Sequence, residues 1–273
     1  MMQLSIKYIG LLLLIAGGLF IFKLLMSSPS NQKKWKPQYQ VLATVKEDSG
    51  NIHIKNLRDF SYHKNGRIED QKYLDKSYKL EDLKSTWFGI SHFAGYGMAH
   101  VFLSFEFANQ QYLVVSIEAR LTVNDANYQP VKGLFRQYTK TVVLATEQDV
   151  IGLRTHIRGE NVYLYQLELS ASQQRKLLLS NLTMAQNLTS EPDFYNTFMD
   201  NCMTGLLAQT NRFSNWTSWL DYRIILPGYA DRLGYDIGLI DNSKTLTEIR
   251  RKAFIDPAGM SLDDADFSVK IRQ

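Results

Sequence analysis

The chain contains a single cysteine, Cys202, in the segment FYNTFMDNCMTGLL. Asp200 and Asn201 are good N-cap residues and an apolar stripe follows them, so the pattern places the thiol in the first turn of a helix. Free backbone amides and the positive end of the helix dipole favour a thiolate there. Lowering the pKa of a thiol by about two pH units takes about 2.7 kcal/mol, whereas a helix terminus supplies about 0.3–1 kcal/mol. A reactive Cys202 therefore needs a neighbouring imidazolium.

A predicted hairpin supplies a histidine with a carboxylate beside it. Segments 99–107 and 112–121 both alternate in polarity and are joined by a short connection, which predicts two antiparallel strands. Matching their apolar faces pairs even-numbered residues with even-numbered residues, because a shift of one residue would turn one strand over. On the other face, which is expected to be polar and also carries Phe102, His100 then lies opposite Glu118 or Arg120, with Glu118 within diagonal reach in either register. The simpler interpretation is an ordinary cross-strand polar pair, which contributes about 0.2–1 kcal/mol.

Together these patterns predict that Cys202 depends on His100 and that His100 depends on Glu118, as in enzymes with an activated thiol nucleophile. A buried structural cysteine is the alternative for a lone thiol. His92 is expected in a glycine-rich loop and is a candidate ligand contact. The remaining histidines have polar neighbours and are expected to be solvated; they are His53, His63 and His156.

Two further sets of side chains are candidates for substrate recognition. Arginines suit a phosphate or a carboxylate, with surface ion pairs as the alternative role; the candidates are Arg120, Arg136, Arg154 and Arg223. Aromatic residues before the histidine strand and after the cysteine helix suit a lipid-facing mouth, with ordinary core packing as the alternative. They are Trp87, Phe88, Phe93, Tyr96, Trp216 and Trp219.

Composition excludes several classes of function. The 273 residues carry 31 Lys and Arg against 27 Asp and Glu, a net charge of +4. This surplus is small for a nucleic-acid-binding protein, which usually has a clustered basic face, so we expect no nucleic-acid partner. One cysteine and five scattered histidines exclude an intrachain disulfide and a multi-thiolate metal site. We therefore expect neither a metal nor a cofactor.

An apolar segment near the amino terminus, within residues 1–26, predicts a single transmembrane anchor. Residues 8–22 carry no charge, and the apolar run continues to Met26. Nineteen helical residues span about 28 Å, enough to cross a bilayer core. A cleaved signal peptide is the alternative, because small serine residues follow directly. By the positive-inside tendency, the lysines that come next favour a cytoplasmic domain; they are Lys33, Lys34 and Lys36.

The rest of the chain divides into a polar tether (27–50), a folded domain (51–256) and a loose carboxyl-terminal tail (257–273). Helical spacing at 171–189 predicts a long helix after the strands, with one side formed by Leu177, Leu178, Asn181, Leu182 and Ala185. Strands followed by helices favour an α+β domain, in which helices pack on an antiparallel sheet. The segments with strand-like alternation are 52–60, 99–107, 112–121, 137–146, 150–158 and 161–169.

Seven motifs follow one another between Asn51 and Ile240: IKNLRDFSY (54–62), MAHVFLSFEF (98–107), YLVVSIEARL (112–121), KGLFRQY (132–138), DVIGLRTHIRG (149–159), FYNTFMDNC (194–202) and LPGYADRLGYDIGLI (226–240). In these motifs and their order the chain resembles the periplasmic domain of Lnb-type lipoprotein N-acyltransferases. The resemblance implies a permuted papain-like, NlpC-type core, in which the histidine strand precedes the cysteine helix. It also implies Cys202 as nucleophile, His100 as base and Glu118 as the third member of a triad. Residue 203 is Met where the family frequently has a small hydroxyl residue.

The resemblance implies a membrane-anchored cysteine acyltransferase. Such an enzyme would take an acyl chain from a phospholipid as a Cys202 thioester and pass it to the N-terminal amine of a diacylated lipoprotein. Backbone donors, aided by Asn201, would meet the oxyanion. The resemblance also implies a single-pass protein of the bacterial inner membrane with its catalytic domain in the periplasm, against the lysine bias. Two other functions stay open: a cell-wall cysteine peptidase or amidase with the same triad, and a non-catalytic module that binds lipid or lipoprotein.

Overall fold

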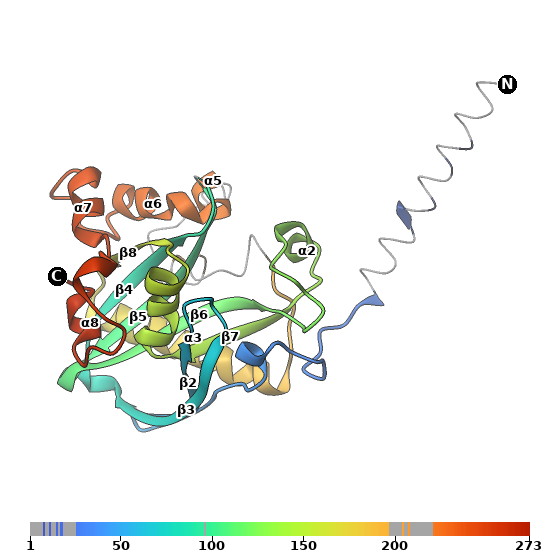
Figure 1. The fold of residues 1–273 in the computed structure, drawn as a ribbon, viewed down its shortest axis with the longest axis horizontal. Helices are drawn as coiled ribbons and strands as arrows, with labels where there is room; N and C mark the ends of the chain where they lie inside the picture. The colour runs from blue at the N-terminus through green and yellow to red at the C-terminus, as the bar shows by residue number, and fades with distance from the viewer. Residues whose placement is uncertain are drawn as a thin grey trace.

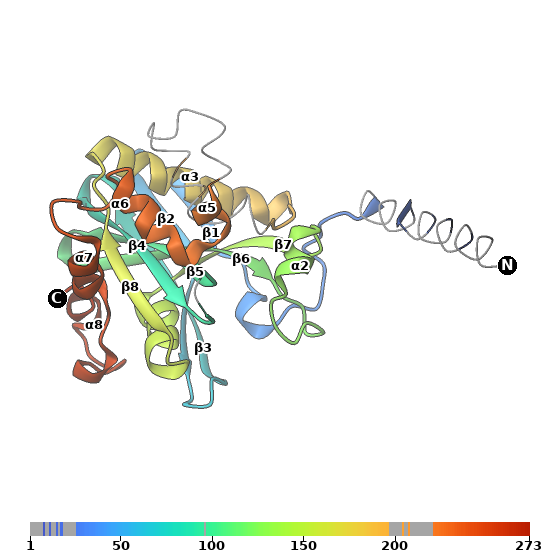
Figure 2. The same ribbon diagram turned by 90° about the horizontal axis from the view of Figure 1, so that it is seen from above.

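The computed structural model describes residues 26–95, 97–196 and 221–273, together with isolated positions. In this part of the chain one twisted sheet lies at the centre, with helices on both of its faces (Figure 1, Figure 2). The result is a mixed fold of an eight-stranded sheet and several helices. The isolated positions are Tyr8, Leu11, Ile15, Gly17, Gly18, Thr204 and Leu207.

The sheet runs in the order β1-β2-β7-β6-β5-β4-β8, and β3 also pairs with β2. Every pairing is antiparallel except that of β2 with β7, whose recorded partners are Arg58 and Ala145. The expected antiparallel sheet with packed helices is therefore present, with one parallel contact. The strands are β1 (Thr44–Asp48), β2 (Asn51–Tyr62), β3 (Ile68–Lys79), β4 (Leu83–His92), β5 (Ala99–Phe107), β6 (Gln111–Arg120), β7 (Thr139–Ala145) and β8 (Asn161–Gln166).

Helix α3 (Ala171–Ser190) covers one face of the sheet. A capping box starts it: Ser170 Oγ accepts from the Gln173 amide, and the Gln173 side chain accepts from the Ser170 amide. Its apolar side joins a core that includes odd-numbered residues of β5 and β6. The predicted stripe is confirmed, since all of its members are buried: Leu177, Leu178, Asn181, Leu182 and Ala185.

The opposite face of the sheet is covered by a wide, π-type helix, η4 (Gln148–Ile157), and by the carboxyl-terminal segment. Phe102 of β5, expected on a polar face, is fully buried in this second core. The predicted strand at 150–158 is wrong. Val150 and Ile151 are consecutive and both fully buried, a pattern that suits a helix lying between layers and not a strand whose side chains alternate.

Strands β1, β3 and β4 have no counterpart among the segments predicted from the sequence, and β1 lies within the predicted tether. Most of β3 is exposed on both of its faces, so burial imposes no alternation of apolar and polar residues there. Strand β4 is largely buried on both faces, so it too lacks the alternation of a half-buried strand. His92, expected in a loop, is the last residue of β4.

Residues 27–50 do not form a free tether. Asn31 Nδ2 donates to the carbonyl oxygen of Leu188 at 2.8 Å, at the end of α3. Trp35 forms an isolated antiparallel bridge with Thr122, and the residue is only 5% exposed. The guanidinium of Arg120 lies 4.2 Å from the centre of the Trp35 ring. The segment is polar in overall composition, but the buried side chain of Trp35 holds it to the domain.

The carboxyl-terminal segment 257–273 is also packed, which corrects the predicted loose tail. Phe267 is fully buried and Ile271 is 5% exposed, both in the core under η4. Arg272 Nη2 lies 2.6 Å from Oε1 of the fully buried Glu147. A buried carboxylate needs such a partner, so Arg272 ties the end of the chain to the start of η4.

Most of residues 1–26, the predicted anchor, lies outside the described residues. Among the residues that the structure describes, no helix is both long enough and apolar enough to cross a membrane. Shorter helices complete the described fold: η1 (Pro37–Tyr39), η2 (Leu80–Asp82), η3 (Ala108–Gln110), α2 (Pro130–Leu134), α5 (Tyr222–Ile225), η6 (Pro227–Tyr229), α6 (Ala230–Asp236), α7 (Leu246–Ala253), η7 (Pro257–Gly259) and α8 (Phe267–Lys270).

Candidate active site

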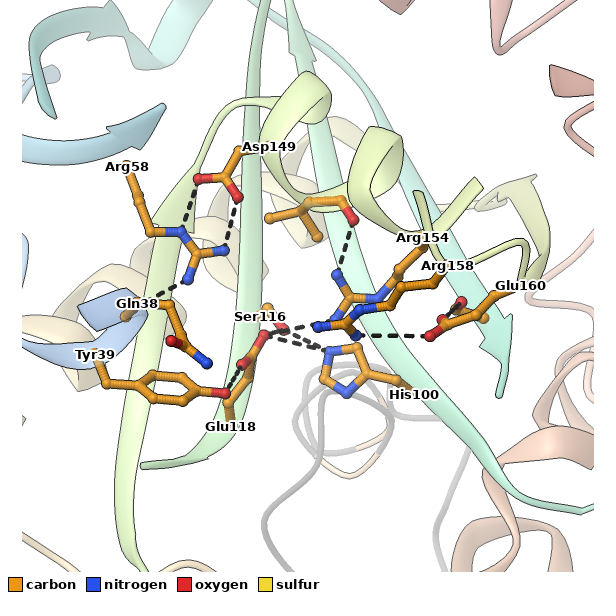
Figure 3. A network of polar contacts seen from close by, with 12 residues as sticks. Gln38, Tyr39, Arg58, His100, Ser116, Glu118, Asp149, Arg154, Arg158 and Glu160 are labelled. Atoms are coloured by element: carbon orange, nitrogen blue, oxygen red, sulfur yellow. Dashed lines mark hydrogen bonds and ion pairs between the residues drawn. The ribbon is translucent and has the colours of Figure 1, made fainter. Parts of the chain in front are cut away.

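The hairpin of β5 and β6 places His100 beside Glu118. Its register pairs Ser104 with Val114, even with even as predicted, and continuing that register sets His100 across from Glu118. His100 Nε2 lies 3.6 Å from Glu118 Oε1. The prediction that His100 lies close to the Glu118 carboxylate is therefore confirmed (Figure 3).

Ser116 lies between the two side chains. Its Oγ donates to Glu118 Oε1 at 2.8 Å and lies 2.7 Å from His100 Nε2. Because the single hydroxyl hydrogen is directed at Glu118, Oγ must accept from Nε2–H. This assignment, made from the hydrogen-bond network, gives a neutral imidazole with its proton on Nε2 and a lone pair on Nδ1.

Tyr39 holds the other oxygen of the carboxylate. Its Oη donates to Glu118 Oε2 at 2.8 Å, and the residue comes from η1, in the segment that precedes the first strand. The Glu118 side chain is 12% exposed, and Ser116 is fully buried. The acid is thus fixed from both sides before any substrate binds.

Helix η4 contributes a cation to the same cluster. Arg154 Nη2 lies 3.7 Å from Glu118 Oε1, and its Nη1 donates to the carbonyl oxygen of Val150 at 2.8 Å. Its Nε is buried and has no hydrogen-bond partner within the described part of the chain. Arg154 is the one predicted substrate-binding arginine that the structure brings to the His100–Glu118 pair.

The surrounding charges keep the imidazole neutral. Burial and the charge of Arg154 lower the pKa of His100 to about 3, and the carboxylate of Glu118 offsets them only in part. Burial alone would raise the pKa of Glu118, but attraction to His100 when its ring is protonated, the charge of Arg154 and the hydrogen bond from Ser116 lower it to about 2. The cluster thus presents a neutral base beside an ionised acid, rather than the standing imidazolium that the sequence analysis required.

A buried ion pair fixes η4 against β2. Arg58 Nε and Nη2 donate to the two oxygens of Asp149 at 2.7 and 2.9 Å. Asp149 is fully buried and also accepts from the Phe60 amide and from Tyr62 Oη. These bonds hold the start of the helix whose next turn carries Arg154 (Figure 3).

His100 remains reachable from outside the cluster. Its side chain keeps 23% of its surface exposed. No hydrogen bond to Nδ1 is recorded from the residues that the structure describes, whereas Nε2 is engaged by Ser116. The free lone pair is therefore positioned to accept a proton from a group that approaches this end of the sheet.

Cys202 and Asn201, the predicted nucleophile and oxyanion donor, lie outside the described residues, as do Tyr96, Trp216 and Trp219. Two nearby positions are described and buried. Thr204 is 8% exposed, and Leu207 is 1% exposed within the core that α3 shares with β5. The meeting of thiol and imidazole stays a prediction.

Two of the remaining predicted arginines bind other parts of the protein. Arg120 donates to the carbonyl oxygens of Tyr39 and Gln40 and to Asn31, which fixes the amino-terminal segment. Arg223 is paired with Asp221 and Asp236. Their hydrogen-bonding groups are thus directed at the protein. The third, Arg136, is exposed and stacks over Phe194, with 5.1 Å between guanidinium carbon and ring centre.

His92 lies on the other face of the sheet from His100. Ser91 pairs with His100 across β4 and β5, so the next residue, His92, points to the opposite side. Its ring packs edge-on against Tyr163 at 5.7 Å. Burial lowers the pKa of His92, and the charge of Asp231 opposes that change. His92 does not join the cluster around Glu118.

Three members of the cluster are new relative to the sequence analysis: Ser116, Tyr39 and Arg58. Ser116 shares its strand face with Glu118, two residues away, so strand alternation would have found it. Tyr39 is 79 positions from Glu118, and no local pattern joins them. Within the described residues, no group of His, Cys, Asp and Glu side chains is arranged to hold a metal ion.

The chain was compared with known families, curated proteins and solved structures. No curated protein and no solved structure gives a significant match. The family described as the Lnb N-terminal periplasmic domain matches residues 69–228, more than half of the chain. This span contains β4, β5, β6 and η4, and therefore His100, Ser116, Glu118 and Arg154. The chain belongs to the Lnb N-terminal periplasmic domain family.

Proposed function

We propose that this protein is a thiol acyltransferase that transfers an acyl chain from a phospholipid to the N-terminal amine of a diacylated lipoprotein. The observation that supports it most is the state of His100. A neutral imidazole with its Nε2–H bonded to Ser116 and its Nδ1 open is the arrangement that a base for a thiol needs. The proposed second partner is Cys202, the single cysteine of the chain, which lies within the span that the family matches.

In the first half-reaction, His100 Nδ1 takes the proton of the Cys202 thiol as the sulfur attacks the ester carbonyl of the phospholipid. A base whose pKa is near 3 holds that proton only beside a new negative charge, and the thiolate supplies that charge. The tetrahedral intermediate then collapses. His100 returns the proton to the departing lysophospholipid oxygen, and an acyl thioester remains on Cys202.

In the second half-reaction, the amine of the acceptor attacks the thioester carbonyl. His100 Nδ1 takes a proton from the amine and returns it to the sulfur as the amide forms. Glu118 stays ionised through both halves, and with Ser116 it stabilises the imidazolium that forms transiently. No external oxidant or cofactor is needed, because the ester supplies the acyl group.

The proposal includes the permuted papain-like core, with the histidine strand ahead of the cysteine helix. It also includes a single-pass anchor in the inner membrane with the catalytic domain in the periplasm; the family description supports the periplasmic placement of the domain. An anchor would keep both lipid substrates close to the site, because tethering raises their effective concentration.

The full chain in lipid vesicles, incubated with a phospholipid that carries a labelled acyl chain, tests the proposal. We expect a hydroxylamine-sensitive label on the protein that is absent from Cys202→Ser. Mass spectrometry of an added diacylated lipopeptide should then show one further acyl group on its amino terminus. A labelled protein that releases only free fatty acid would indicate a hydrolase. No label on the wild-type protein would refute covalent catalysis and leave a binding module.

A further inference from the structure

The site lies at one end of the sheet, and two segments project beyond that end. Strand β4 ends and β5 begins there, joined by residues 93–98, and β6 ends and β7 begins there, joined by residues 121–138. His100 and Glu118 occupy the adjoining strand positions. Both views show the second segment, which carries α2, extending from the body on the side where residues 27–36 run (Figure 1, Figure 2).

Both projections expose apolar side chains to solvent. On the segment 121–138, Val123 is 53% exposed, Val131 is 66% and Leu134 is 37%. On the turn 93–98, the exposed apolar residues are Phe93 and Met98. A group of exposed apolar side chains on a folded domain commonly marks a surface for a partner or a membrane.

The turn 93–98 is held next to a further exposed apolar residue. The Gly228 amide donates to the Gly97 carbonyl oxygen at 3.1 Å. A Cβ built on Gly97 would lie 3.6 Å from the Leu226 side chain, so the two segments are in close contact. Leu226 is 39% exposed, and it extends the apolar surface of the turn.

Charge and connectivity indicate a lipid partner. The Val123 amide donates to the carbonyl oxygen of Lys34, and the Lys36 amide donates to that of Leu121. Lys34 is eight residues after Met26, the end of the apolar run, so at most about 28 Å of chain joins the two. The exposed basic side chains beside the projection are Lys33, Lys34 and Arg136, and basic residues next to apolar ones suit an anionic bilayer surface.

We propose that segments 93–98 and 121–138 form a bilayer-docking surface that seats the domain on anionic lipid with the His100 end of the sheet facing the membrane. The apolar side chains enter the interface and the basic side chains contact headgroups. This surface is separate from the proposed chemistry, and it would hold for any function of the His100 cluster.

The test uses the full chain with Cys202→Ser, so that an introduced cysteine is the sole thiol. Val131→Cys and a control, Lys176→Cys on the exposed side of α3, are labelled with the fluorophore NBD. Each protein is reconstituted into vesicles of phosphatidylethanolamine and phosphatidylglycerol. We expect dithionite, which reduces NBD from the water phase, to act at least threefold more slowly at position 131 than at position 176, and nitroxide-labelled lipid to quench position 131 only.

Equal dithionite rates at the two positions, without quenching by nitroxide lipid, would overturn the proposal. Protection at position 131 that requires added membrane proteins would also overturn it, in favour of a protein partner. Phe93→Cys provides a second reporter on the other projection and should behave like position 131. Because the readout needs no catalysis and the nucleophile is absent, failure of the acyl-transfer proposal does not affect the result.

Discussion

After burial, the charge of Arg154 is the largest influence that lowers the pKa of His100, and Arg154→Gln tests it. Arg154 Nη2 and His100 Nε2 lie 3.7 and 3.6 Å from the same oxygen, Glu118 Oε1, so they are at most about 7 Å apart. Two unit charges at about 7 Å interact by about 2.4 kcal/mol at an effective dielectric constant of about 20. This energy corresponds to a change in pKa of nearly two pH units.

The substitution removes a positive charge that opposes protonation of His100, so the pKa of His100 should rise. Loss of Arg154 also leaves the negative charge of Glu118 less compensated, which acts in the same direction. We expect an increase of about one to two pH units from a wild-type value near 3. An NMR titration of the His100 ring in the full chain measures it directly, and the acid limb of the kcat/KM profile of the proposed enzyme should move to higher pH.

Arg158→Gln is the matched control. The Arg158 side chain is 49% exposed, lies 3.6 Å from Glu160, and lowers the pKa of His100 less than Arg154 does. Solvent screens an exposed charge, so this variant should change the titration by well under one pH unit. An unchanged or lowered pKa of His100 in Arg154→Gln, or equal changes in both variants, would refute the electrostatic reasoning.

Three further predictions concern His100, Ser116 and Gly228. The pKa of His100 is near 3 in the folded chain and about 6.5 when unfolded, so the unfolded state binds more protons between these values and the unfolding free energy falls as pH drops through them. Urea unfolding at pH 7 and 5 should show a weaker pH dependence in His100→Gln than in the wild type. Ser116→Ala should mix the two tautomers of the His100 imidazole, which ¹⁵N chemical shifts detect, and should slow thioester formation about 5- to 30-fold. Ser116→Thr keeps the hydroxyl group, so it should restore the single tautomer and the rate. Retention of one Nε2–H tautomer in Ser116→Ala would contradict the assignment. Gly228→Ala should lower Tm by several degrees, because its Cβ would lie 2.8 Å from the Gly97 backbone, whereas Gly259→Ala meets nothing within 4 Å and should be neutral.

The hairpin could be predicted from the sequence because its information is local. Alternation in 99–107 and 112–121 fixes which side chains share a face, and matching two apolar faces leaves only even-with-even registers. The expectation of a polar face around His100 is only partly right. That face is polar near the cluster, but at Phe102 it is as deeply buried as the apolar face of the strand. Alternation does not distinguish a face that meets solvent from one that meets a second layer.

The parts that could not be predicted depend on distant residues. Tyr39 reaches Glu118 from 79 positions away, and Arg154 reaches it from a segment whose residues suggested a strand. The hydrophobic periodicity of η4 is weak, and the buried ion pair between Arg58 and Asp149 holds this helix against β2. A buried charge pair carries no periodic signal in the sequence, so only the folded arrangement reveals it.

The amino-terminal segment connects the orientation of the domain with the geometry of the site. Tyr39 bonds to the Glu118 carboxylate, and the carbonyl oxygen of Tyr39 accepts from Arg120. Three residues earlier, the Lys36 amide bonds to Leu121, where the projection with α2 begins. The same stretch of chain thus holds the acid beside His100 and the surface proposed to contact lipid. A movement of this stretch relative to the sheet would change both sets of contacts, so the proposed seating on the bilayer would be coupled to the support of the base.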